Sequence, residues 1–266
     1  MANVLVISSF VASGTVGLQA AVPALQAQGH CAMQLPTILL SNHSRYRHMA
    51  RTDISISALR DMLSALDGNG WLSSIDVVLS GYLPDEGHAV FVRDAARLVR
   101  ERAQHALYIC DPVIGDDPSG IYVPVRTAEN IREQLIPLAD VITPNRFELA
   151  WLSGHPVVDA ASAGKAARRI GCAHTTATSI PHGPDLLATI LFTARAEKVM
   201  AAKRLPSVPH GTGDLFAGLL AGNLASGQPV QDAFEAACAA LTSVIVRSAG
   251  QKKLELSALT VLSEPP

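Results

Sequence analysis

The chain has 266 residues, of which 48% are hydrophobic and 17% charged, and its formal net charge is −2. A charge balance so close to zero gives no electrostatic reason to expect nucleic acid or an anionic membrane as a partner, and no apolar run is long enough to cross a bilayer. The chain enters its first predicted strand without a basic segment before it, so we expect no secretory signal and a cytoplasmic protein. The four cysteines lie far apart without metal-site spacing, which predicts reduced, mostly buried thiols.

Predicted strands and helices alternate along the chain. Short apolar runs predict strands at residues 4–7, 31–40 (broken by Pro36), 77–79, 107–110, 141–142 and 174–178. Helical patterns predict helices at residues 18–28, 54–66, 89–104, 127–135, 159–170, 215–224 and 230–246, and one that starts at residue 145. We expect an antiparallel hairpin at residues 186–193 and 197–201, a small flap at 119–124, and a surface tail from residue 256. This order predicts a single α/β domain over residues 1–266, with a mostly parallel central sheet and helices on both faces, in three layers.

Polar clusters follow the carboxyl ends of most of these strands, which is where open α/β sheets bind their ligands. Ser9, Tyr82 and Asp111 each come soon after a predicted strand, and Asp116 lies a few residues further on. Because these strand ends share one edge of the sheet, we expect the clusters to form one site. The acidic residues have an ordinary alternative, since Asp-Pro and Gly-Asp are common turn pairs.

Two further clusters also have two interpretations. Asn145 can cap the helix that it starts, with Glu148 completing a capping box. Alternatively, Glu148 faces a nucleotide and orders a metal-bound water. A basic stretch after the second strand serves either an anionic ligand or solubility, and it contains Arg45, Arg47, His48 and Arg51.

The most informative stretch runs from His210 to Gly218 and reads His-Gly-Thr-Gly-Asp-Leu-Phe-Ala-Gly. Its two leading glycines open a buried helix, so backbone N–H groups at the helix start favour a bound anion. Asp214 lies in the first turn of that helix, where an aspartate commonly caps the N-terminus. It could equally act as a general base that takes a proton from a hydroxyl group while the N–H groups hold a phosphoryl group. The local chemistry does not separate these two roles.

The motifs together resemble those of the pyridoxal kinase family within the ribokinase-like superfamily, and the resemblance covers almost the whole chain. Ser-Asn-His at residues 41–43 and Ser-Gly-Tyr at 80–82 are the more particular motifs. Asp-Pro-Val at 111–113 and Thr-Pro-Asn at 143–145 also occur in hydroxymethylpyrimidine kinases, and Gly-Thr-Gly-Asp at 211–214 belongs to the superfamily. The resemblance implies a three-layer ribokinase-like fold and a homodimer.

The reaction implied is ATP-dependent phosphorylation of the 5′-hydroxyl of pyridoxal, giving pyridoxal 5′-phosphate in vitamin B6 salvage. Pyridoxine and pyridoxamine are further candidate substrates. The family uses ATP with Mg²⁺, often helped by a monovalent cation, K⁺ or Na⁺. The alternatives are a kinase of the same superfamily for hydroxymethylpyrimidine or another small molecule, and a catalytically weak B6-binding protein.

The resemblance also implies a role for each matching residue. Asp214 becomes the catalytic base, and Gly211, Thr212 and Gly213 form an anion hole. The vitamin pocket is implied at Ser9, Val16, Ile38, His43, Ser44 and Tyr82. The ATP side is implied at Asp111, Asp116, Tyr122, Thr143, Glu148, Thr178 and Ser179. Among these, the metal is implied at Asp111, Asp116 and Glu148, through bound water.

Four positions depart from the family pattern. Ser8 and Phe10 stand where family members usually have Gln and His, Leu18 replaces an Asn, and His210 replaces an apolar residue. We expect Phe10 and Leu18 to lie close to the vitamin pocket, so that these changes affect substrate affinity and choice more than phosphoryl transfer.

Overall fold

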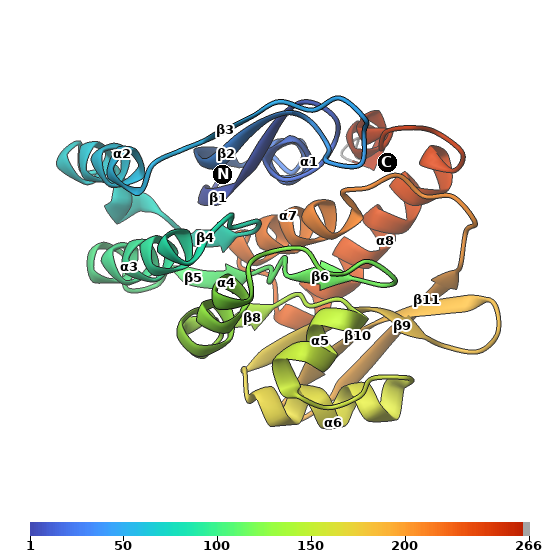
Figure 1. Cartoon of the computed structure of the whole chain (residues 1–266). Coiled ribbons are helices and arrows are strands. Elements are labelled where there is room, and N and C mark those ends of the chain that lie inside the picture. The colour runs from blue at the N-terminus through green and yellow to red at the C-terminus, as the bar shows by residue number, and fades with distance from the viewer. Residues whose placement is uncertain (263–266) are drawn as a thin grey trace.

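The computed structural model describes residues 1–262 and has a nine-stranded sheet at its centre (Figure 1). The strands lie in the order β11-β10-β9-β8-β5-β4-β1-β2-β3 across the sheet. Their bounds are β1 Asn3–Ser13, β2 Cys31–Asn42, β3 Arg51–Asp53, β4 Val77–Ser80, β5 Leu107–Cys110, β8 Val141–Ile142, β9 His174–Pro181, β10 Leu186–Thr193 and β11 Glu197–Lys203. A separate two-stranded sheet pairs β6, Gly115–Asp116, with β7, Gly120–Ile121.

The six strands from β9 to β2 pair in parallel, and antiparallel strands occur only at the two edges of this sheet. The carboxyl ends of β1, β4, β5, β8 and β9 therefore meet at one edge. This arrangement confirms the predicted mostly parallel sheet and the predicted hairpin of β10 and β11.

The helices connect these strands and cover both faces of the sheet (Figure 1). Their bounds are α1 Leu18–Ala27, α2 Ile56–Gly68, α3 Glu86–Arg102, α4 Val125–Asn130, α5 Arg146–Ser153, α6 Ala160–Ile170, α7 Thr212–Ala225 and α8 Val230–Ser248. Short 3₁₀ or π turns lie at η1 Trp71–Ser74, η2 Ile131–Leu135, η3 Ile136–Leu138 and η4 Leu256–Leu262.

The central strand β1 shows why the molecule has three layers. Successive side chains of a strand point to opposite faces. Val4 and Val6 accordingly pack into a core with α1, α7 and α8, whereas Leu5 and Ile7 pack into a second core with α2, α3 and α4. Both faces of the strand are buried, which explains its continuous apolar sequence.

The first two strands are longer than predicted. Strand β1 continues to Ser13, and β2 continues through Pro36 to Asn42. Pro36 is opposite Ser8, beside an irregularity in the pairing between Ser8 and Phe10. On its other side β2 pairs with β3 only at residues 38–40, so the missing N–H of Pro36 interrupts no hydrogen-bond ladder there.

The remaining differences from the prediction are local. Strand β3 was not predicted, and the predicted helix at residues 127–135 is α4 followed by a π turn. The tail does not lie wholly at the surface, because Ala258 and Leu259 are buried against α1 and α8. The expected end of the tail at Pro265–Pro266 lies outside the described residues.

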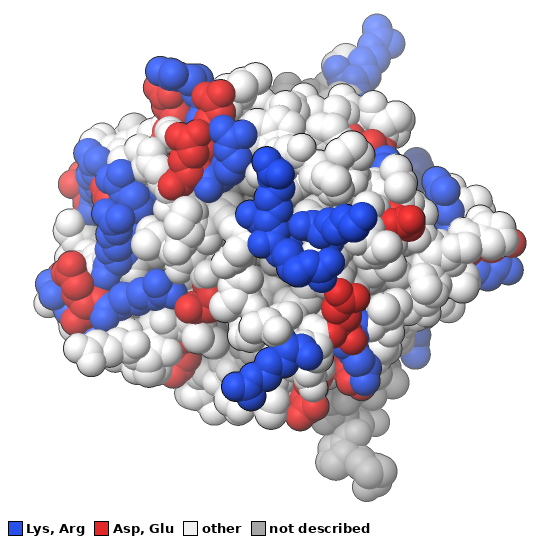
Figure 2. Space-filling view, turned by 90° about the horizontal axis from the view of Figure 1, so that it is seen from below, with Lys and Arg blue, Asp and Glu red and all other residues white. Residues whose placement is uncertain are grey.

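The surface charges, the cysteines and the helix lengths relate to the expectations that came from the composition. Lysines, arginines and acidic residues are interspersed on the face shown in Figure 2. Cys110 and Cys238 are buried, Cys172 is partly buried and Cys31 is exposed, and all four are free thiols. No helix in residues 1–262 is long and apolar enough to cross a membrane.

Candidate active site

The site is built around the N-terminus of α7. Gly211 precedes this helix with φ 101° and ψ 5°, in the left-handed region that favours glycine. A Cβ atom at this position would lie 1.7 Å from the carbonyl oxygen of Thr15. No side chain of the described residues caps the helix, so its first N–H groups are available to an anion.

Asp214 is the third residue of α7 and is half-buried. Burial raises the pKa of its carboxyl group to about 6, although the N–H groups of Gly17 and of Asp214 itself oppose this shift. A carboxylate with this pKa is ionised at neutral pH and is a stronger base than an ordinary aspartate. Asp214 is not the N-cap residue of α7, since Gly211 holds that position, and its role as a base stays a prediction.

A second buried carboxyl group, that of Asp111, lies near Asp214 at the end of β5. The hydroxyl of Thr143, at the end of β8, donates to its Oδ1 at 2.7 Å. Burial and the charge of Asp214 raise the pKa of Asp111 to about 7, against the effect of that hydrogen bond. Both carboxyl groups line one small cavity, together with Gly81. A Cβ atom at Gly81 would lie 2.5 Å from Ser8 Oγ and 3.9 Å from Asp214 Oδ1, so glycine keeps this space open.

Asn145 and Glu148 form the predicted capping box of α5. Glu148 does more than this, because its Oε1 also accepts a hydrogen bond from the N–H of Ile114 at 2.9 Å. Its Oε2 accepts from the N–H of Asn145 at 2.9 Å. Burial and then the charge of Asp111 raise the pKa of Glu148 well above its usual value, while the backbone N–H groups oppose the shift. Glu148 thus fastens the loop after β5 to the start of α5, and the capping interpretation is confirmed.

Asp116 lies on β6, further toward the surface. Its Oδ1 is buried and has no hydrogen-bond partner among the described residues. Its Oδ2 lies 3.6 Å from the guanidinium of Arg45, which also donates to Ser119 Oγ at 3.1 Å. Arg45 therefore closes the basic loop after β2 over the β6–β7 hairpin.

The other predicted ATP-side residues also lie at this edge of the sheet. Tyr122 follows β7 and is 46% exposed. Burial of its hydroxyl and the nearby carboxylates, Glu148 foremost, raise the pKa of Tyr122. Thr178 on β9 pairs with Asn145 and donates its N–H to the carbonyl of Pro144 at 2.9 Å. Ser179 is exposed and takes the left-handed conformation with φ 61°.

A cavity of about 450 Å³ lies on the other side of the α7 N-terminus. Of the six predicted vitamin-pocket residues, Val16 and His43 line it. The ring of His43 stacks on that of His210, with centroids 4.4 Å apart, and burial lowers the pKa of both imidazoles. The lining also contains basic residues from two distant segments, namely Arg47, Lys252 and Lys253.

The other four predicted pocket residues lie outside the lining of this cavity. Ser9 is buried in β1, and its carbonyl oxygen is so close to Gly17 that a Cβ atom there would lie 2.2 Å away. Ile38 is buried in β2, Ser44 is exposed, and Tyr82 is partly buried after β4. The sequence did not indicate Lys252 and Lys253, because only the fold brings them to the end of β1, where Lys253 Nζ donates to Ser13 Oγ at 3.1 Å.

Two of the departures from the family pattern are explained by packing. Leu18 is 2% exposed and belongs to the core of α1, α7 and α8. Phe10 is partly buried and packs against the same core. Leu18 and Phe10 therefore make their contacts with the helix layer, and the expectation that they lie close to the vitamin pocket stays a prediction.

The predicted metal residues do not form a direct ligand cluster. No group of three or more His, Cys, Asp or Glu side chains in the described part of the chain is arranged to hold a metal ion. This arrangement agrees with the expectation that a metal would be held through water, but it does not test that expectation.

A mostly parallel α/β sheet, a helix N-terminus without a side-chain cap and a half-buried carboxylate with a raised pKa fit the ribokinase-like class of small-molecule phosphotransferases that the motifs resemble. Comparison with known proteins narrows this class. The chain matches the family model described as phosphomethylpyrimidine kinase over residues 12–257. It is 34% identical to pyridoxal kinase PdxY of Leifsonia xyli subsp. xyli, covering 82% of this chain and 79% of that protein.

Two further similarities agree with this assignment. The chain is 36% identical to a pyridoxine/pyridoxal/pyridoxamine kinase of Bordetella avium, over 88% of this chain and 81% of the relative. The structure of pyridoxal kinase from Leishmania donovani in complex with ADP and pyridoxine superposes with a TM-score of 0.87 at 31% identity, covering 98% of this chain and 93% of that one. The chain belongs to the pyridoxal kinase family of the ribokinase-like superfamily.

Proposed function

We propose that this protein transfers the γ-phosphoryl group of ATP to the 5′-hydroxyl of pyridoxal, giving pyridoxal 5′-phosphate and ADP. Pyridoxine and pyridoxamine are further substrates in this proposal. The observation that carries it is the position of Asp214, a carboxylate with a pKa raised to about 6 at the uncapped start of α7. The names of the relatives, which are kinases of B6 vitamers, support the choice of substrate.

In the proposed reaction, Asp214 accepts the proton of the 5′-hydroxyl as that oxygen attacks the γ-phosphorus. A bond forms between the 5′-oxygen and phosphorus, and the bond from phosphorus to the β–γ bridging oxygen breaks, so that ADP leaves. The N–H groups at Gly211, Thr212 and Gly213 stabilise the equatorial oxygens of the transferring group. The left-handed backbone of Gly211 aims these N–H groups, since it starts α7 against the loop that follows β1.

The acidic residues at the sheet edge fit a magnesium ion bound through water. Asp116 has a buried Oδ1 without a hydrogen-bond partner in residues 1–262, and oxygen is the ligand type that Mg²⁺ requires. Asp111, Asp116 and Glu148 would hold the ion through its water shell, with Glu148 limited by its backbone contacts. When bound, Mg²⁺ neutralises charge on the ATP phosphates.

The proposal extends to properties that family membership supports. These are use of a monovalent cation, K⁺ or Na⁺, a homodimeric assembly, a cytoplasmic location and a single domain across the chain. The continuous sheet and the three hydrophobic cores around it, which draw on elements from β1 to η4, support the single domain.

The decisive experiment is a phosphorylation assay with ATP and Mg²⁺ against pyridoxal, pyridoxine, pyridoxamine and hydroxymethylpyrimidine. We expect turnover with at least pyridoxal, seen as pyridoxal 5′-phosphate and an equal amount of ADP. Hydroxymethylpyrimidine is included because the matching family model is described as phosphomethylpyrimidine kinase. A strong preference for hydroxymethylpyrimidine would replace the proposed substrate, and vitamer binding without turnover would favour a B6-binding protein.

A further inference from the structure

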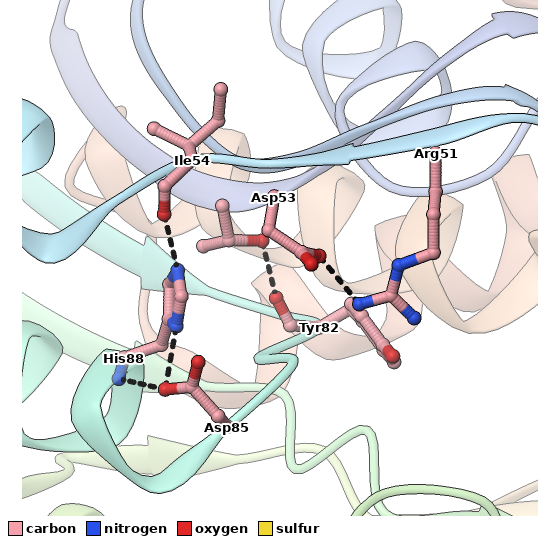
Figure 3. A network of polar contacts seen from close by, with 7 residues as sticks. Arg51, Asp53, Ile54, Tyr82, Asp85 and His88 are labelled. Atoms are coloured by element: carbon pink, nitrogen blue, oxygen red, sulfur yellow. Dashed lines mark hydrogen bonds and ion pairs between the residues drawn. The ribbon is translucent and has the colours of Figure 1, made fainter.

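His88 is a buried histidine that the proposed chemistry does not use. It is the third residue of α3 and is 2% exposed. Its Nδ1 lies 2.8 Å from Asp85 Oδ1, and its Nε2 lies 3.1 Å from the carbonyl oxygen of Ile54 (Figure 3). The backbone N–H of His88 donates to the same Asp85 oxygen at 3.0 Å, which caps α3.

Both ring nitrogens of His88 face oxygen atoms of the protein, a carboxylate oxygen and a carbonyl oxygen. Because His88 is buried, water cannot readily replace either contact if the ring is lost.

Asp85 is the one carboxylate of the described residues within ion-pair distance of His88. The nearest charged residues on β3, Arg51 and Asp53, pair with each other at 2.5 Å. Glu86, the neighbour of Asp85, lies 3.5 Å from Arg126 of α4.

The contacts of His88 connect two segments that border Tyr82. Ile54 directly follows β3, a three-residue edge strand whose residues are all exposed and which pairs only with β2. Asp85 comes three residues after Tyr82. His88 therefore ties the end of β3 to the chain that carries Tyr82.

A second contact fastens the same loop from the other side. The hydroxyl of Thr37 on β2 donates to the carbonyl oxygen of Tyr82 at 2.8 Å. The Tyr82 side chain points toward Arg51 (Figure 3), and the charges of Arg51 and Asp53 both act on its hydroxyl. Ile38, another predicted pocket residue, is the pairing partner of Asp53. Besides the pairing of β3 with β2, the contact of His88 with the Ile54 carbonyl therefore holds the end of this edge strand.

We propose that His88 is a positioning residue of the vitamin pocket: through its two ring contacts it ties the end of β3 to the start of α3 and so fixes Tyr82 beside the β2–β3 hairpin. This inference rests on the proposed function and on the place in the vitamin pocket that the family resemblance implies for Tyr82. His88 itself touches neither substrate. Its loss should weaken vitamin binding while the phosphoryl-transfer groups at α7 remain in place.

The positioning role is tested by kinetics with a matched control. His88→Gln keeps one donor but cannot make both contacts, so the KM for pyridoxal should rise by about threefold to tenfold, the loss of one to two hydrogen bonds. The kcat and the KM for ATP should change little. Ser55→Ala is the control, because Ser55 follows Ile54 and caps α2 through the N–H of Ala58, without contact to His88.

Ser55→Ala should lower thermal stability and leave the KM for pyridoxal unchanged. Equal changes of that KM in the two variants, or a fall of kcat alone in His88→Gln, would overturn the positioning role. If His88→Gln does not fold, Asp85→Asn, which weakens the contact to His88 Nδ1, takes its place, and the same rise in the KM for pyridoxal is expected. Wild-type turnover of pyridoxal tests the proposed function separately, so the failure of one proposal is distinguishable from the failure of the other.

Discussion

Gly211 and Thr15 are in such close contact that the loop before α7 and the loop between β1 and α1 form one unit. A Cβ atom on Gly211 would lie 1.7 Å from the Thr15 carbonyl oxygen, and the φ of Gly211 is 101°. Glycine is therefore required here for two reasons, since an L side chain would be strained by the backbone and would also clash. Two residues later Gly213 has an ordinary φ, and a Cβ atom there would meet nothing within 4 Å.

This contrast gives a matched pair of variants. Gly211→Ala should lower the free energy of unfolding by about 2–4 kcal/mol, from backbone strain and overpacking. Gly213→Ala should be close to neutral for stability, because its site has room and it keeps its N–H. Chemical denaturation of the two variants measures this. Equal loss of stability in both would mean that the contact of Gly211 with Thr15 does not constrain the loop.

The role of Asp214 as a base predicts a specific loss of turnover. Asp214→Asn keeps the size of the side chain but cannot accept the proton, so kcat should fall by about 10²–10⁴-fold with the fold unchanged. Asp232→Asn is the matched control, since Asp232 also lies in the first turn of a helix, α8, but is exposed. Initial rates of ADP release with pyridoxal compare the two. Near-normal turnover of Asp214→Asn would exclude the base.

The raised pKa of Asp214 predicts the pH dependence of the reaction. Burial raises this pKa to about 6, so below this pH the protonated fraction grows and the base is lost. The kcat/KM should therefore fall about tenfold for each pH unit below about 6 and level off above it. Asp111 lies close to Asp214 and has a pKa raised to about 7. The fall of kcat/KM on the acidic side of the pH profile therefore reports the titration of the two carboxyl groups as a coupled pair.

Repeating the pH profile with pyridoxine shows whether the fall in rate comes from ionisation of the substrate or of the enzyme. The ring of pyridoxine ionises differently from that of pyridoxal, so a fall in kcat/KM at the same pH with both substrates belongs to the enzyme. If kcat/KM stays constant down to the ordinary pKa range of aspartate, burial does not raise the pKa of Asp214 in the working enzyme.

The parts of the fold that follow from local sequence were predictable. Strand β5 has the predicted bounds, Leu107–Cys110, because an apolar run between two strand neighbours is buried on both faces. Strand β3 could not be predicted, since Arg51–Asp53 is exposed and polar and is extended only by pairing with β2. Pro36 misled the prediction because its tolerance depends on an edge that the sequence does not reveal.

The candidate site also has parts that follow from local sequence and parts that depend on the fold. The capping box of Asn145 and Glu148 spans three residues and could be read locally, as could the glycines before α7. The stacking of His43 on His210 joins segments far apart in the chain, so no local sequence pattern could predict it. The burial of Leu18 in the core of α1, α7 and α8 could not be predicted from the motifs, because a motif comparison aligns positions without showing which face of the helix they occupy.

The contacts of Glu148 predict two separable effects of Glu148→Gln. Its two carboxylate oxygens accept N–H groups of Ile114 and Asn145, and a glutamine offers one oxygen and one opposing amide. The free energy of unfolding should therefore fall by about 1–3 kcal/mol. If Glu148 also orders the waters of Mg²⁺, the variant should need more Mg²⁺ for half-maximal rate, with little change in vitamin binding without nucleotide.

The control for this variant is the second capping box of the chain. Ser162 completes the box that Asp159 starts at α6, away from the acidic edge residues. Ser162→Ala should lower stability without changing the Mg²⁺ dependence. If Glu148→Gln behaves in the same way, the role of Glu148 is limited to capping and to holding the loop after β5.

Leu18 offers a test of packing against substrate recognition. Its side chain is 2% exposed in the core of α1, α7 and α8, so Leu18→Asn would bury an amide without a partner and remove apolar contacts. We expect a loss of about 2–4 kcal/mol in the free energy of unfolding, and no lower KM for pyridoxal. Leu18→Met, which nearly conserves volume and polarity, should cost less than about 1.5 kcal/mol. A stable Leu18→Asn variant with a lower KM for pyridoxal would instead place this residue at the vitamin pocket, because only a contact with the polar ligand could compensate the amide.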